Sequence, residues 1–166
     1  MKRQIITLGF IFFVGLTFAQ NPIEKGRGQF NTGLGFSTWG LPVYAGFDIG
    51  VHRDITVGGE LSLRFYDDWY RDVSYNQSII GILGNSNYHF NTLLKIPRNW
   101  DVYAGLNLGF YIWNSEDGYP GPHSSGFELG AQMGGRYYFN NKFGLNLEFG
   151  GSSSFSGGKF GISLRL

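Results

Sequence analysis

The chain contains no cysteine, which excludes disulfides and thiolate metal sites. Charged residues are also scarce: they make up 15% of the 166 residues, against about 25% in soluble globular proteins. After residue 20 no helical periodicity is present, so no helix is expected there. Aromatic residues, in contrast, reach 18%, and 27 residues are glycine. This composition predicts a β protein whose outer surface is not an ordinary water-facing surface.

The N-terminal end has the three-part pattern of a secretory signal peptide. A basic start is followed by an apolar run from Ile5 to Phe18, and the small residue Ala19 precedes the expected cut. The run is shorter than the roughly 20 residues that a membrane-spanning helix needs, which disfavours an uncleaved anchor. We therefore predict a signal peptide over 1–19 and one domain over 20–166. Without the two basic residues of the leader, 11 basic residues face 12 acidic ones, so strong attraction to nucleic acid is not expected.

Apolar residues recur at every second position in eight segments of the expected domain, which is the period of a β-strand with two unlike faces. Strands of about this length and number are typical of small membrane barrels. The pattern predicts an all-β fold, an eight-stranded antiparallel up-and-down transmembrane β-barrel. The outermost apolar positions of the eight segments are 30–36, 43–51, 55–65, 80–90, 102–112, 127–139, 143–149 and 160–166.

The expected connections alternate in length. Tight turns are predicted at 53–54 and 140–141, with a longer link over 91–99 on the same side. Outer-membrane barrels keep short turns in the periplasm and place longer loops outside the cell, so this asymmetry favours an outer-membrane barrel. The longer loops are predicted on the opposite side, over 37–42, 67–77, 114–125 and 151–158.

A soluble barrel of the lipocalin type alternates as well, but its apolar face points inward around a ligand cavity. Here aromatic residues gather near the strand ends of the apolar face and aliphatic residues fill the middle, as in the two girdles of a membrane barrel. The polar face is rich in glycine, which suits a narrow lumen. Its charges also balance, as buried charges must. The predicted lumen charge network sets Asp48, Glu60, Glu128 and Glu148 against Arg64, Arg136, Lys159 and Arg165.

The last segment, 159–166, reads polar-x-Gly-x-x-apolar-x-apolar and is similar to the insertion signal of outer-membrane barrels. Together with the leader, the eight segments and the asymmetric loops, it resembles the small OmpA/OmpX-like outer-membrane β-barrel family. The resemblance covers the whole expected domain. It implies a Gram-negative outer membrane, contact with its lipid and lipopolysaccharide, insertion by the barrel-assembly machinery through the last strand, a monomer, and a lumen plugged by side chains.

The lumen charges could line a narrow ion channel, but an eight-stranded barrel is too narrow for an open pore, so a structural salt-bridge core is favoured. A His-x-Ser pair at His123 and Ser125 resembles that of lipid A deacylases built on small barrels. A serine nucleophile needs a base and an orienting acid, and the neighbouring outward faces offer no carboxylate. No catalytic residue is therefore predicted.

The predicted loop over 67–77 contains Trp69, Tyr70 and Arg71, residue types that are enriched at binding hot spots. They predict a loop interaction site, unless they only continue the interfacial belt. The acidic residues of this loop and of the loop over 114–125 lack calcium-loop spacing, so neither a metal nor a cofactor is expected. The predicted role is structural or loop-mediated. The alternatives are a lipid-modifying enzyme, a soluble lipocalin-like ligand binder and a narrow ion channel.

Overall fold

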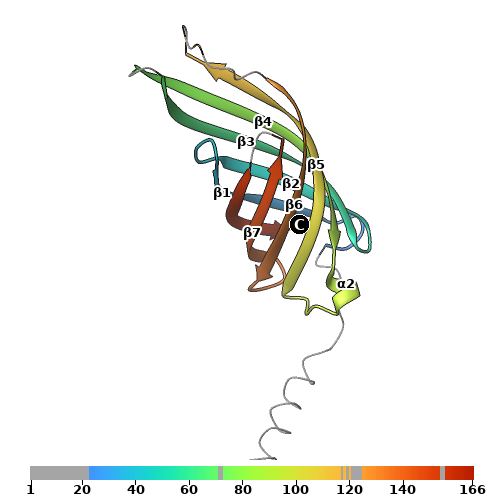
Figure 1. The fold of residues 1–166 in the computed structure, drawn as a ribbon. Helices are drawn as coiled ribbons and strands as arrows, with labels where there is room; N and C mark the ends of the chain where they lie inside the picture. Colours follow the sequence, from blue (N-terminus) through green and yellow to red (C-terminus); the bar gives the residue numbers. More distant parts are fainter. Residues whose placement is uncertain (1–22, 71–72, 117, 119, 121–124, 154–155) are drawn as a thin grey trace, which may run out of the picture.

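The computed structural model describes residues 23–166 except 71–72, 117, 119, 121–124 and 154–155. The leader expected over 1–19 lies outside the described residues. The strands form a closed antiparallel barrel in sequence order, with the first strand paired to the last (Figure 1). This confirms the predicted eight-stranded up-and-down barrel. Its strands are β1 (Gly28–Ser37), β2 (Val43–His52), β3 (Ile55–Tyr70), β4 (Val73–His89), β5 (Trp100–Ser115), β6 (Gly126–Tyr138), β7 (Phe143–Ser152) and β8 (Ser156–Arg165).

The apolar face of the strands points outward, as the alternation predicted. In the middle of the wall, Leu106 on β5 is 63% exposed and Leu129 on β6 is 66% exposed, while Tyr103 on the other face of β5 is 2% exposed. The lumen is therefore the polar interior and the outside is the apolar surface. A lipocalin-like barrel requires the reverse arrangement, so this alternative is wrong for the described residues.

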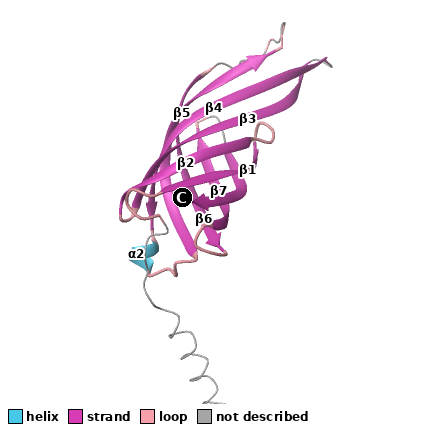
Figure 2. Ribbon diagram, turned by 180° about the vertical axis from the view of Figure 1, so that it is seen from behind, coloured by secondary structure: helices cyan, strands magenta, loops and turns pink. Residues whose placement is uncertain are grey.

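The barrel wall is taller on one side (Figures 1 and 2). β3, β4 and β5 have 16, 17 and 16 residues, whereas β1, β2, β7 and β8 have 10 each. β2 first pairs with β3 at Val43 and Leu63, so the remainder of β3 rises beyond β2. The tall side of the barrel is the side formed by β3, β4 and β5.

The predicted loop over 67–77 was wrong, because β3 and β4 continue as a paired hairpin as far as Tyr70 and Val73. Alternation marks a strand only where one face is apolar and the other polar. Beyond Phe65 both faces of the hairpin mix polar and aromatic residues, with Asp67 and Trp69 on one face and Tyr66 and Asp68 on the other, so the backbone pairing leaves no apolar period. The loop predicted over 151–158 is also shorter, since β7 runs through Ser152 and β8 begins at Ser156.

The end of the barrel opposite the tall side's tip carries the short connections, and we call it the turn end. The turn at 53–54 is confirmed by the strand bounds, and the turn predicted at 140–141 lies within a four-residue connection, 139–142. The link between β4 and β5 holds a one-turn helix, α2 (Asn91–Leu94), although no helix was expected after residue 20. Its Asn91 side chain donates to the carbonyl of Trp100 and accepts from the amide of Val102. These side-chain hydrogen bonds to the start of β5 hold the single turn in place without any apolar period.

Glycine is required where β1 and β8 close the barrel. A Cβ on Gly161 would lie 2.1 Å from the carbonyl oxygen of Thr32, and one on Gly33 would lie 2.2 Å from that of Phe160. Both distances are far shorter than a van der Waals contact, so only a residue without a side chain allows these strands to approach so closely.

No helix in the described part of the chain is long and apolar enough to cross a membrane.

Candidate functional site

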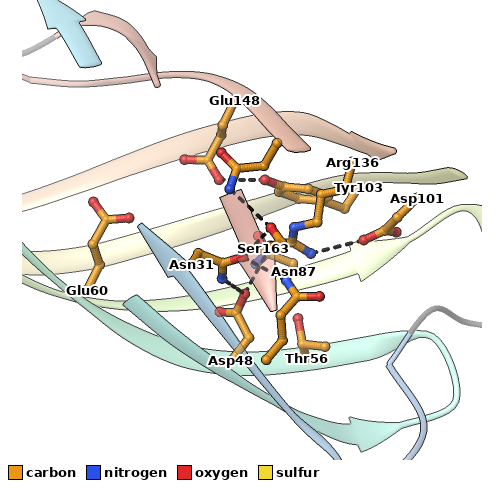
Figure 3. Close-up of polar contacts among 12 residues, drawn as sticks. Asn31, Asp48, Thr56, Glu60, Asn87, Asp101, Tyr103, Arg136, Glu148 and Ser163 are labelled. Atoms are coloured by element: carbon orange, nitrogen blue, oxygen red, sulfur yellow. Dashed lines mark hydrogen bonds and ion pairs between the residues drawn. The ribbon is translucent and has the colours of Figure 1, made fainter. Parts of the chain in front are cut away.

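The centre of the lumen is organised by Arg136, which β6 projects inward (Figure 3). Its Nη1 donates to Oδ2 of Asp101 on β5 at 2.9 Å, and its Nη2 donates to Oδ2 of Asp48 on β2 at 3.0 Å. Its guanidinium carbon also lies 4.2 Å from the centre of the Tyr103 ring. Arg136 and both carboxylates are buried. One guanidinium therefore joins opposite walls of the barrel through two charge-assisted hydrogen bonds.

A second chain of contacts leads from Asp101 to β3. Nδ1 of His89 lies 2.7 Å from Oδ1 of Asp101, and Nε2 of His89 lies 3.0 Å from Oγ1 of Thr56. Hydroxyl, imidazole and carboxylate in this order are the arrangement of a nucleophile, a base and an orienting acid. All three side chains have zero exposure. Because no substrate can reach the Thr56 hydroxyl, the arrangement serves to satisfy buried polar groups.

Amide and hydroxyl side chains connect Asp48 to the β1–β8 seam. Asn31 donates to Asp48 at 2.9 Å, and Ser163 donates to Asn31 at 2.7 Å. Asn146 then donates to Ser163 at 3.0 Å and accepts from the Tyr44 hydroxyl at 2.7 Å. Figure 3 shows Asn31, Asp48 and Ser163 within this cluster. The seam strands are therefore linked by side chains as well as by backbone pairing.

Nearer the opposite end of the lumen, Lys159 on β8 lies between two carboxylates. Its Nζ is 2.7 Å from Glu60 on β3 and 2.6 Å from Glu148 on β7. Glu148 also accepts a hydrogen bond from the Tyr103 hydroxyl at 2.8 Å. One ammonium group therefore joins carboxyl groups from two different strands. The Tyr103 hydroxyl joins this group to the layer that Arg136 organises.

The structure thus places five of the eight predicted lumen charges in these two ion-pair groups. The other three have different contacts. The Arg64 guanidinium lies 5.3 Å from the centre of the Tyr111 ring, and Glu128 accepts a hydrogen bond from Ser153 at 2.6 Å. Arg165 lies at the turn end, away from both groups: it lines the mouth of the barrel there.

Sequence reasoning missed two members of the network, Asp101 and His89. Asp101 shares the inward parity of Tyr103, but it precedes the first apolar residue of its segment and so was not counted as part of a strand. His89 was placed on the polar face and was not counted among the charges. Extending each predicted strand by one residue would have found Asp101.

Aromatic side chains pack together on the inner face of the tall side. The rings of Trp39, Tyr66 and Trp113 are in mutual contact, with centroids 5.8, 5.9 and 6.3 Å apart. Below them Ile79 and Tyr111 are buried. We call these five residues the aromatic cap. A cavity of about 90 Å³ is lined by Tyr111 and Lys159 and reaches Ser37 and Ser156 at the rim. A second void of about 20 Å³ lies within the ion-pair network.

The predicted loop interaction residues lie at the tip of the β3–β4 hairpin. Trp69 pairs with Ser74 and is 72% exposed on the outward face. Phe65, at the loop end of the apolar face, precedes it by four residues. At a rise of about 3.3 Å per residue, Trp69 lies roughly 13 Å further along the strand than Phe65. The Tyr70 side chain and Arg71 lie outside the described residues.

The loop residues that were candidates for catalysis or metal binding either form hydrogen bonds or lie outside the described residues. Oγ of Ser125 accepts a hydrogen bond from the backbone amide of Trp113 at 3.0 Å, while His123 lies outside the described residues. The Glu116 carboxylate accepts a hydrogen bond from the backbone amide of Asn76 at 3.0 Å and so links the end of β5 to β4. In the described part of the chain, no three His, Cys, Asp or Glu residues are grouped so that they could hold a metal ion.

Several solved outer-membrane barrels have this fold. OprG from Pseudomonas aeruginosa superposes with a TM-score of 0.65 at 9% identity, covering 87% of this chain and 97% of OprG. Neisserial surface protein A gives 0.58 at 13% identity, covering 84% and 95%. Ail, the attachment invasion locus protein of Yersinia pestis, gives 0.52 at 12% identity, covering 86% and 100%. No protein-family model and no curated protein sequence matches the chain. The likeness confirms the predicted fold resemblance to small eight-stranded outer-membrane barrels.

Proposed function

We propose that the protein is an integral outer-membrane barrel with a closed lumen, whose turn end faces the periplasm. The observation that carries this proposal is the inverted distribution of side chains. Exposed leucines cover the middle of the outer wall, while Arg136, Asp48 and Asp101 are buried inside. Water favours the opposite arrangement, whereas hydrocarbon outside a closed sheet favours this one.

The network supports a closed lumen. Arg136 links Asp48 and Asp101 across the barrel, and the void beside them is about 20 Å³, enough for about one water molecule. An ion would have to displace these paired side chains in order to pass. A narrow ion channel is therefore less well supported than a structural plug.

An enzymatic role is also less well supported. The hydroxyl of Thr56 is buried where it contacts His89, and Oγ of Ser125 accepts a hydrogen bond from the backbone amide of Trp113. In the proposed location, outer-membrane lipid and lipopolysaccharide surround the apolar wall. The barrel-assembly machinery would insert the chain through β8, after removal of the leader over 1–19, and the barrel would act as a monomer.

The test combines three measurements on the full chain: membrane fractionation, electrophoresis with and without boiling, and conductance in planar bilayers. We expect the outer-membrane fraction, a heat-dependent mobility and no conductance steps. The positive control is the double variant Asp101→Ser/Arg136→Ser, which removes one charge of each sign from the lumen. We expect this variant to have a higher background conductance than the unmodified chain. A freely soluble protein without a mobility shift would overturn the membrane proposal. Stable conductance steps in the unmodified chain would overturn the closed lumen.

Loop-mediated interaction is a second candidate function, and it rests on the β3–β4 hairpin. Trp69 is exposed on the outward face of the paired hairpin, and tryptophan is enriched at binding hot spots. Ail, whose name refers to attachment and invasion, shares the fold, which is compatible with a surface role. The test is adhesion of bacteria that display the chain to immobilised glycans and matrix proteins. Loss in Trp69→Ala but not in Ser74→Ala would support the proposal, and equal adhesion of all three would refute it.

A further inference from the structure

The turn-end mouth of the barrel contains a pocket of about 560 Å³, formed by residues 23–28, the β4–β5 link, the β6–β7 turn and the end of β8. Four cationic side chains line it, and Glu24 is the one carboxylate side chain among its described lining residues. With Glu24 and the main-chain carboxylate of Leu166 counted against them, the four cations still leave the pocket with an excess of positive charge. The four cations are Arg27, Arg98, Lys142 and Arg165.

The pocket cations differ from the cations of the lumen. Arg136 and Lys159 are each held between two carboxylates, whereas the ion pairs found between described residues include none of the four pocket cations. Four positive charges that share one pocket repel one another, and nearby anionic groups would relieve that repulsion. The pocket is thus electrostatically suited to an anion.

Arg165 adds a second, independent observation. Its guanidinium carbon lies 3.2 Å from the centre of the Tyr138 ring, and its Nη2 donates to the carbonyl of Arg98 at 3.4 Å. Its Nε is buried and has no hydrogen-bond acceptor among the described residues. Burial puts this Nε out of reach of a molecule in the pocket, so a phosphate bound there would accept from the Nη groups of a guanidinium that ring stacking already holds in place.

The lining of the pocket indicates what carries the phosphate. Phe139 and Leu166 line the same pocket and are 58% and 63% exposed. Phe139 stacks on Phe143 with ring centroids 6.0 Å apart, within the turn-end aromatic girdle. The pocket thus extends from the charged mouth to the apolar rim. A molecule with a phosphate and an acyl chain matches both parts, whereas a free anion matches only the first.

We propose that this mouth binds the phosphate of an anionic glycerophospholipid headgroup from the leaflet at the turn end. The inference rests on the proposed membrane location. Arg98, Lys142 and Arg165 contact the headgroup, and the acyl chains lie along the outer wall beside Phe139. The bound lipid would place the turn end at a fixed depth in the membrane.

The test measures lipid binding to the refolded full chain in an uncharged detergent by native mass spectrometry. Phosphatidylglycerol, phosphatidylcholine and inorganic phosphate are titrated separately. The pocket variant is Arg98→Gln/Lys142→Gln/Arg165→Gln. The control variant, Lys25→Gln/Arg53→Gln/Lys95→Gln, loses the same charge from residues near the turn end that do not line the pocket.

We expect phosphatidylglycerol to bind at least tenfold more weakly to the pocket variant, since each lost charge-assisted hydrogen bond corresponds to about that factor, and within twofold of wild type to the control. Equal weakening in both variants, equal binding of phosphatidylcholine, or equally tight binding of inorganic phosphate would overturn the proposal. If the triple variant does not fold, Lys142→Gln on the exposed turn provides the same comparison against Lys95→Gln. A boiled and unboiled gel of every sample reports separately whether the barrel itself has formed.

Discussion

Arg136→Met should be among the most destabilising single substitutions in the lumen. Methionine keeps much of the length of the side chain but removes the charge between Asp48 and Asp101. Two charge-assisted hydrogen bonds of 2.9 and 3.0 Å are lost, and two buried carboxylates lose their counter-charge. Removing one partner of a buried ion pair costs roughly 3–5 kcal/mol. We expect a loss of this size in the free energy of unfolding.

The assay is reversible urea unfolding in lipid vesicles, followed by tryptophan fluorescence. The double variant Asp101→Asn/Arg136→Met provides the comparison, because it also removes one of the two carboxylates that Arg136→Met leaves without a counter-charge. Residues that share a network couple by about 0.5–3 kcal/mol, so the double variant should be less destabilised than the sum of the two single variants. Lys95→Met, at an exposed position of the β4–β5 link that does not line the turn-end pocket, is the control and should change stability by no more than about 0.5 kcal/mol.

Two results would refute this reasoning. A cost for Arg136→Met below about 1 kcal/mol is what exposed ion pairs give, and it would mean that water solvates the carboxylates and that the lumen is not closed. Strict additivity of Asp101→Asn and Arg136→Met would mean that the two side chains do not interact. Either outcome would remove the central support for a plugged barrel.

Two further substitutions test the wall. Leu106→Arg places a charge in the middle of the lipid-facing band and should destabilise the inserted barrel by roughly 2–4 kcal/mol. This cost should appear as a lower yield of the heat-modifiable form, whereas Asn107→Ala should insert normally. Equal yields of the two variants would contradict the assigned lipid face. Gly161→Ala puts a methyl group 2.1 Å from the carbonyl oxygen of Thr32 on the closing seam, and overpacking of this kind costs about 1–3 kcal/mol in urea unfolding. Gly126→Ala, which has no atom within 4 Å of its Cβ position, should be tolerated, and similar midpoints for the two alanine variants would argue against a tight seam.

The sequence alone determined the number of strands, their order around the barrel and the face that each presents. The reason is that lipid on one side and a polar lumen on the other impose a period of two on every strand between the two rims. Leu106 and Tyr103 were assigned to opposite faces on this basis, and the structure agrees. The period ends where that constraint ends. The β3–β4 hairpin beyond Phe65 is held by backbone pairing, and the single turn of α2 is held by hydrogen bonds between the Asn91 side chain and the start of β5. Neither kind of contact produces an apolar period.

The tertiary structure alone decided which polar groups meet. Arg136 and Asp48 are 88 residues apart, and their contact depends on the register of strands that are not neighbours in the barrel. A balance of charges on the polar face predicts that pairs exist, but it does not say which pairs form. It could not show that Asp101 and His89 complete the central layer, or that Arg165 joins a cationic mouth at the turn end. Parity is a property of one strand, whereas a contact across the lumen is a property of the closed barrel.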